Sequence, residues 1–269
     1  MNYFLVALAA LMSLQVHAQT LRFGIVPQQS ATVLATGWTP IMRYLSEVTG
    51  DNIVFATAPD IPTFEKRLLD GEYDVAYMNP YHFTFFNEHR GYKAIARRGD
   101  ASIQGIIVVR KDSPINELSE LNGQRLAFPS PAAFAASVVP RAVLANSGVE
   151  IEPVYVSSHD SVYLNVSKGF FVAGGGIGRT LNSTNPEVAE QLRVLWKTNE
   201  YTPHAIAAHP RVDTETFDRL SAALVTMADK PQGLALLKPL SISRWQASVD
   251  ADWDDVRALK IDLLDVILE

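Results

Sequence analysis

The sequence predicts an α/β protein of two lobes, each a mixed sheet flanked by helices. Three observations support this prediction. The first part of the chain alternates strand, helix, strand, helix and strand, an order that implies parallel pairing. A second alternating run begins near residue 125, and two long extended stretches, 103–115 and 192–210, act as crossovers between the runs. Such an architecture places a cleft between the lobes, lined by strand ends and helix starts.

Hydrophobic periodicity defines the elements of the first lobe. Three short apolar runs bounded by turn residues are typical of buried strands: 21–27, 52–58 and 73–80. Two stretches place apolar residues at helical spacing: 38–50, which ends at a glycine, and 61–73. The remainder of the chain after residue 210 is rich in Leu and Asp and is expected to be helical.

Polar residues follow two of the strands of the first lobe. Gln28 and Gln29 come after the first strand, and Asn79 and Tyr81 come after the third. In parallel sheets ligands bind beyond the carboxyl ends of the strands, so these four residues are candidate ligand contacts. The alternative for the two glutamines is that they simply face water.

The second lobe is expected to continue the alternation of strands and helices. Its expected elements are a strand over 125–130, a helix over 131–148, a strand over 152–157, a helix over 158–169 and a strand over 170–176. Ser130 is suited to an N-cap, and Pro131 to the first helical position. We therefore favour an N-cap role for Ser130 over a role as a ligand contact.

The first turn of the helix predicted over 131–148 offers an anion site made of backbone groups. A helix start carries unpaired N–H groups and the positive end of the dipole. The side chains there are small or apolar, namely Ala133, Phe134 and Ala135, and Ser137 follows one turn on. An anion bound at this turn would be held by backbone amides; the alternative is that the turn is small only to let the lobes pack.

Composition excludes several classes of function. The chain has no cysteine, which removes disulfides, thiolate metal sites and thiol nucleophiles. Its formal net charge of −6 gives no support for nucleic-acid binding. No nucleophile elbow, P-loop, dinucleotide fingerprint or metal-ligand spacing occurs, so we expect no enzyme activity, no metal and no cofactor. A catalytic alternative rests only on His159, Asp160 and Ser137, and neighbouring positions in sequence do not make a triad.

The N-terminal residues predict export. Residues 1–18 contain no charged side chain and carry an apolar run too short to span a bilayer. They end in Val16-His17-Ala18, a small-x-small pattern suited to signal peptidase, so cleavage is expected after Ala18. The mature chain would then reside in the periplasm.

The residues resemble a known family. Segments including FGIVPQQSA, FATAPD, YDVAYMNP, GIIVVRKDSPINELSELNG, SHDSVY and LWKTNEYTPHAIAAHP are together similar to the phosphate/phosphite/phosphonate-binding proteins of bacterial ABC importers. The similarity runs in order from about residue 21 to 235. It implies a type II periplasmic-binding-protein fold with a two-stranded hinge. The implied lobes are 19–105 with 203–269, and 106–202.

This resemblance implies a function without catalysis. A monomeric periplasmic protein would capture a small anionic ligand, phosphonate-like or phosphate-like, and deliver it to a membrane permease. An alternative partner is a membrane receptor, such as a histidine kinase, to which the loaded protein would report the ligand. Nothing in the sequence separates these two partners.

The residues that the family uses for its ligand match only in part. Members that hold a phosphonate have a Ser-Thr-Ser run in the turn where this chain has Ala133, Phe134 and Ala135. Tyrosines that line the first-lobe side match Ile61 and Met78. The ligand is therefore expected to have an anionic end and an apolar or flat body.

The charged positions of the family pocket also differ. His159 matches the family's pocket histidine and is a candidate ligand contact. The equal alternative is a structural, cap-like contact at the start of a helix. Carboxylates that hold an amine in some members are replaced by Gly178-Arg179 and His204. Arg179 is either an anion clamp or a solvated charge, and His204 either a contact or a structural hydrogen bond. Amine-bearing ligands are expected to bind poorly.

Overall fold

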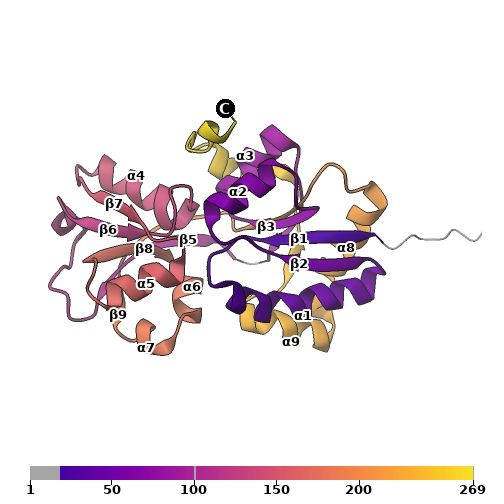
Figure 1. The fold of residues 1–269 in the computed structure, drawn as a ribbon, viewed down its shortest axis with the longest axis horizontal. Helices are drawn as coiled ribbons and strands as arrows, with labels where there is room; N and C mark the ends of the chain where they lie inside the picture. Colours follow the sequence, from indigo (N-terminus) through magenta and orange to yellow (C-terminus); the bar gives the residue numbers. More distant parts are fainter. Residues whose placement is uncertain (1–18, 100, 269) are drawn as a thin grey trace, which may run out of the picture.

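The computed structural model describes residues 19–99 and 101–268, and the predicted signal peptide over 1–18 lies outside these residues. Two sheets form two lobes (Figure 1). The six-stranded sheet of the first lobe has the order β11-β4-β10-β3-β1-β2. Its strands are β1 (Thr20–Ile25), β2 (Asn52–Ala56), β3 (Val75–Met78), β4 (Lys93–Arg98), β10 (Ala205–Ala208) and β11 (Trp245–Ala247).

The second lobe contains the five-stranded sheet, with the order β7-β6-β8-β5-β9. Its strands are β5 (Ile103–Arg110), β6 (Arg125–Phe128), β7 (Glu152–Tyr155), β8 (Ala173–Ile177) and β9 (Leu192–Tyr201). Both sheets are mixed, as predicted. The strands of the alternating runs pair in parallel, and β10 and β5 join them antiparallel.

Helices cover both faces of each sheet (Figure 1). The helices of the first lobe are α1 (Ala31–Thr49), α2 (Ile61–Leu69), α3 (Pro80–Arg90), α8 (Thr214–Val225), α9 (Pro231–Leu237) and α10 (Asp254–Arg257). Those of the second lobe are α4 (Val139–Asn146), α5 (His159–Ser167), α6 (Gly178–Ser183) and α7 (Pro186–Ala189). Short single turns are η1 (Leu118–Leu121), η2 (Phe134–Val138), η3 (Met227–Asp229), η4 (Lys238–Leu240), η5 (Asp250–Trp253) and η6 (Asp265–Ile267). No helix in the described part of the chain is long and apolar enough to cross a membrane.

The chain crosses between the sheets twice. It passes from β4 to β5 and returns from β9 to β10, and β5 and β9 pair antiparallel at the crossing, with Ile103 opposite Tyr201. This arrangement confirms the predicted two-lobed fold with its two-stranded hinge. Sheet membership changes between Arg98 and Ile103 and between Tyr201 and Ala205. The predicted boundary between 202 and 203 falls in the second crossing, whereas the predicted boundary between 105 and 106 lies inside β5.

Two predicted elements have different bounds. Helix α1 begins at Ala31 and not at residue 38, because Ser30 caps it by accepting the N–H of Val33 at 3.4 Å. The buried stripe of α1 accordingly starts at Leu34. The strand predicted over 103–115 ends at Arg110, where the chain turns and the guanidinium pairs with Asp112 at 2.6 Å.

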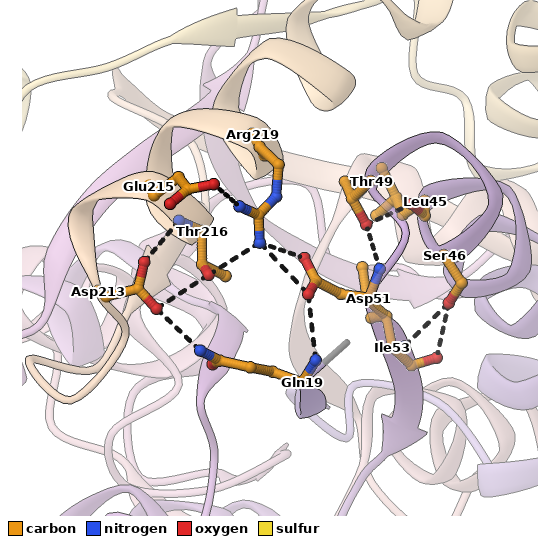
Figure 2. Close-up of polar contacts among 10 residues, drawn as sticks. All are labelled: Gln19, Leu45, Ser46, Thr49, Asp51, Ile53, Asp213, Glu215, Thr216 and Arg219. Carbon is orange, nitrogen blue, oxygen red and sulfur yellow. Dashed lines mark hydrogen bonds and ion pairs between the residues drawn. The ribbon is translucent and has the colours of Figure 1, made fainter. Parts of the chain in front are cut away.

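A polar cluster fixes the start of β1 to the helices beside it (Figure 2). The Asp51 carboxylate is fully buried and accepts from the Arg219 guanidinium at 3.0 Å and from the backbone N–H of Gln19 at 3.3 Å. The Gln19 side chain donates to Asp213 at 2.9 Å. A buried carboxylate depends on such charged and polar partners, because its desolvation is otherwise uncompensated.

We expect Asp51→Asn to lower the free energy of unfolding by about 1.5–3 kcal/mol, since it removes a buried charge-assisted hydrogen bond to Arg219. The matched control is Glu215→Gln, which removes an exposed carboxylate from the same guanidinium and should have a much smaller effect. Urea unfolding of the three proteins measures this difference. Equal losses in the two variants would contradict the role given to Asp51.

Candidate functional site

The helix of the second lobe begins with one widened turn, η2. The N–H of Val138 bonds to the carbonyl of Ala133 at 3.2 Å, and the N–H of Val139 bonds to that of Phe134, which makes a π-helical turn. The predicted N-cap role of Ser130 is wrong. The helix starts at Phe134, and the Ser130 hydroxyl is buried without a hydrogen-bond partner among the described residues.

Two glycines explain how close this turn lies to the sheet. A Cβ added at Gly105 on β5 would meet the Ala135 carbonyl oxygen at 1.9 Å, and one at Gly175 on β8 would meet that of Ala136 at 1.9 Å. Carbonyl groups of the turn therefore press directly on two strands, an approach that only glycine permits. The glycine run 174–176 forms part of strand β8, and at Gly175 it admits the neighbouring backbone.

Three backbone donors of the turn are left without acceptors. The N–H groups of Phe134, Ala135 and Ala136 have no hydrogen-bond partner within the described residues, as expected for the first turn of a helix. All three residues are buried. Buried N–H groups without partners are rare in proteins, so this turn provides a site for an external acceptor.

These donors adjoin a small cavity between the lobes, of about 10 Å³. A cavity of this size holds about one water molecule. Both lobes and the first crossover contribute to its lining, which consists of Val26, Gln28, Ile61, Asn79, Ile103, Ala133, Phe134, Ala135, Ala136, His159, Ile177 and His204. No acidic side chain is among them.

Hydrogen bonds across the cleft hold the lobes closed. The N–H of His159 donates to the carbonyl of Gln28 at 3.0 Å. Further bonds that cross the cleft are Asn79 Nδ2 to the Ala132 carbonyl (3.2 Å), Gln29 Nε2 to Ser183 Oγ (3.1 Å), Ser30 N to Asp160 Oδ2 (3.2 Å) and Arg179 Nη2 to Gln28 Oε1. The structure is therefore a closed arrangement of the two lobes.

Gln28 connects the basic groups around the cavity. Its Nε2 lies 3.0 Å from Nε2 of His204, and its Oε1 accepts from Nη2 of Arg179. The His204 ring also stacks on Tyr77, with ring centroids 5.0 Å apart. The cavity is thus surrounded by groups that can donate a hydrogen bond or carry positive charge.

Both cavity histidines are held in the neutral form. Burial, followed by the charge of Arg179, lowers the pKa of His159 to about 3. The same two causes, burial first, lower the pKa of His204 well below its usual value. His159 is fixed through Nδ1 by the Thr180 hydroxyl at 3.1 Å, and Thr180 lies 2.8 Å from the Tyr163 hydroxyl.

The structure brings together many of the residues that the sequence singles out. Eight of the predicted contacts line the cavity: Gln28, Ile61, Asn79, Ala133, Phe134, Ala135, His159 and His204. Arg179 adjoins them through Gln28, and Gln29 crosses the cleft to Ser183.

Four predicted contacts lie elsewhere: Met78, Tyr81, Ser130 and Ser137. Met78 belongs to the core of the first lobe, and the Tyr81 hydroxyl accepts the N–H of Leu264 at 2.8 Å near the C-terminus. Strand-end position alone placed Tyr81 in the cleft. Tyr81 is buried, and its contact with the C-terminal segment is one that sequence patterns do not position.

Some lining residues were missed by sequence reasoning. Ile177 ends β8 and Ile103 begins β5, so both occupy the cleft edge of their strands. The rule that ligands bind beyond strand ends could have identified Ile177. No local signal marks Ala136.

The fold and the site define a class of protein. Two α/β lobes, a two-stranded hinge and a buried, acid-free cavity between the lobes are the features of a type II periplasmic solute-binding protein. Residues 23–253 match the model of a family described as ABC transporter, phosphonate, periplasmic substrate-binding protein. The chain belongs to this family, whose members deliver a small solute to the membrane permease of an ABC transporter.

Individual relatives agree with this assignment. The phosphate-import protein PhnD of Mycolicibacterium smegmatis is 22% identical, over 89% of this chain and 84% of the relative. The solved binding protein of an ABC phosphonate transporter from Pseudomonas aeruginosa has a TM-score of 0.83 at 20% identity and covers 90% of this chain and 86% of its own. PhnD1 of Prochlorococcus marinus, solved with methylphosphonate, has a TM-score of 0.81 at 17% identity, over 89% and 96%.

The low pKa of His159 predicts acid sensitivity. Below pH 6.5 the unfolded chain takes up a proton that the folded chain accepts only near pH 3. Stability should therefore fall with decreasing pH, by up to about 1.4 kcal/mol per pH unit for this residue. His159→Gln should remove that contribution. Urea unfolding between pH 6.5 and 4.5 measures both slopes, and identical slopes would contradict a neutral, buried His159.

Proposed function

We propose that this chain captures a small tetrahedral oxyanion of the phosphonate class in the cavity between its lobes. The observation that supports this most is the set of three buried N–H groups without acceptors, those of Phe134, Ala135 and Ala136. Two relatives, a phosphate-import protein and a protein solved with methylphosphonate, point to the same class of ligand.

Electrostatics favours an anion at this position. The three donors lie at the start of a helix, where the dipole is positive. Neutral imidazoles of His159 and His204 and the amides of Gln28 and Asn79 surround them, and no carboxylate of the lining opposes a negative charge. Oxyanions accept strongly from backbone N–H groups in a buried site.

The ligand enters when the lobes separate. A phosphonate is larger than the single water that the closed cavity holds. The segments between β4 and β5 and between β9 and β10 are the two places where the backbone can bend without disturbing a sheet. Opening there exposes the donors of η2, and the lobes then close around the ligand.

In this proposal the chain acts as a monomer, and its signal peptide is cleaved after Ala18. The partner is a permease, which the family assignment favours over the alternative of a membrane sensor. Among the described residues few polar bonds cross the cleft, and only those of Arg179 and Asp160 involve a charged group. Such a cleft suits repeated opening and closing.

A substitution at Ala133, which precedes the turn, tests the proposal. Ala133→Asp should abolish binding of methylphosphonate, with a loss of about 100-fold or more, because its carboxylate would take up the free N–H groups and repel an anion. Ala133→Ser is the matched control and should retain binding, since it adds only a hydroxyl.

Calorimetry with methylphosphonate, phosphate and phosphite measures these affinities. Thermal unfolding provides a second readout, because a ligand at a hundred times its Kd adds about 2.7 kcal/mol. Unchanged affinity in a folded Ala133→Asp protein would show that the turn is not the anion site. Failure of all three anions to bind would overturn the proposed ligand class.

A further inference from the structure

A second, larger cavity lies at the hinge, beside the small one. It has a volume of about 470 Å³ and is lined by residues of both crossovers, including Gln104 and Pro203, and by the start of α6. We call this cavity the hinge chamber. It is large enough for several non-hydrogen atoms of a ligand, whereas the small cavity holds about one water.

The hinge chamber is cationic. Arg98, Arg179 and Lys197 line it, and among the described residues of its lining Glu200 alone is acidic; its carboxylate accepts from the Ser102 hydroxyl at 2.8 Å. Within the described residues none of the three cations has a carboxylate within 4.0 Å. This concentration of positive charge occurs in a chain whose net charge is −6.

Of the three cations, Arg98 has a buried donor atom without an acceptor among the described residues. This atom is Nε, while Nη2 donates to the carbonyl of Ser241 at 2.6 Å. Burial and the neighbouring charge of Arg179 lower the pKa of Arg98. A half-buried guanidinium beside a second one is unfavourable, and an anion between them would relieve both the desolvation and the repulsion.

The two cavities share part of their walls. Ile103, Ile177 and His204 line both of them. Arg179 lines the hinge chamber and donates to Gln28, which lines the small cavity. A ligand whose head is held by the N–H groups of η2 would have to pass these three shared residues to reach the hinge chamber.

We infer that the ligand carries two acidic groups, a phosphonate head and a carboxylate at the end of a short chain, with the carboxylate bound in the hinge chamber by Arg98, Arg179 and Lys197. The position of the head rests on the proposed function. The carboxylate neutralises these cations, which have no carboxylate partner within the described residues, and the same cations repel ligands that end in an ammonium group.

Two ligands that differ only at the far end test this inference. 3-Phosphonopropionate ends in a carboxylate where propylphosphonate ends in a methyl group. Calorimetry on the mature chain should show at least about 10-fold tighter binding of the former. Arg98→Gln should reduce that preference to about threefold or less.

Two further variants separate binding from folding. Lys197→Gln removes an exposed cation of the hinge chamber, and so lowers the preference with little effect on folding. Lys93→Gln is the matched control, because it removes the same charge from an exposed position on β4 that does not line the chamber. It should leave the preference unchanged.

Each result has a distinct meaning. If propylphosphonate binds and 3-phosphonopropionate binds no better, the second acidic group is refuted while the proposed function stands. Retention of the full preference in both Arg98→Gln and Lys197→Gln also refutes it. If neither ligand binds and phosphate, phosphite and methylphosphonate also fail, the proposed function and this inference fail together.

Discussion

The contact between η2 and the strands beneath it determines the rest of the site. Because Gly105 and Gly175 lack side chains, the carbonyls of Ala135 and Ala136 can lie directly against β5 and β8. Their N–H groups then face the first lobe, where the helix offers no acceptors for them. The protein thus holds a set of rigid backbone donors on the scaffold of the second sheet, and β5 links that sheet directly to the hinge.

The distribution of charge complements this backbone geometry. The closed cleft is held by hydrogen bonds that are mostly between neutral groups, and its histidines are neutral because of burial. Arg98 and Arg179 remain close to the cavity without carboxylate partners in the described residues. An anionic ligand would therefore satisfy the free N–H groups and the guanidinium groups together. Both lobes would contribute contacts to it.

The sequence predicted the architecture because it depends on periodicity and element order, which are local signals. It brought Ala133–Ala135, His159 and Gln28 into the candidate site from their positions at helix starts and a strand end, and all of them line the small cavity. It misplaced the helix start at Ser130, because the helix begins only at Phe134 with the widened turn η2, which packs on Gly105 and Gly175 from distant parts of the chain. Arg98 was not identified at all, since nothing in its local sequence shows that β4 ends beside α6.

The central claim is that three free N–H groups of η2 hold the ligand, and amide NMR tests it most directly. In a titration of the ¹⁵N-labelled mature chain with methylphosphonate, the largest downfield proton shifts should occur at Phe134, Ala135 and Ala136, because a charge-assisted hydrogen bond forms at each. Saturable binding that leaves these three amide signals unchanged would contradict the account.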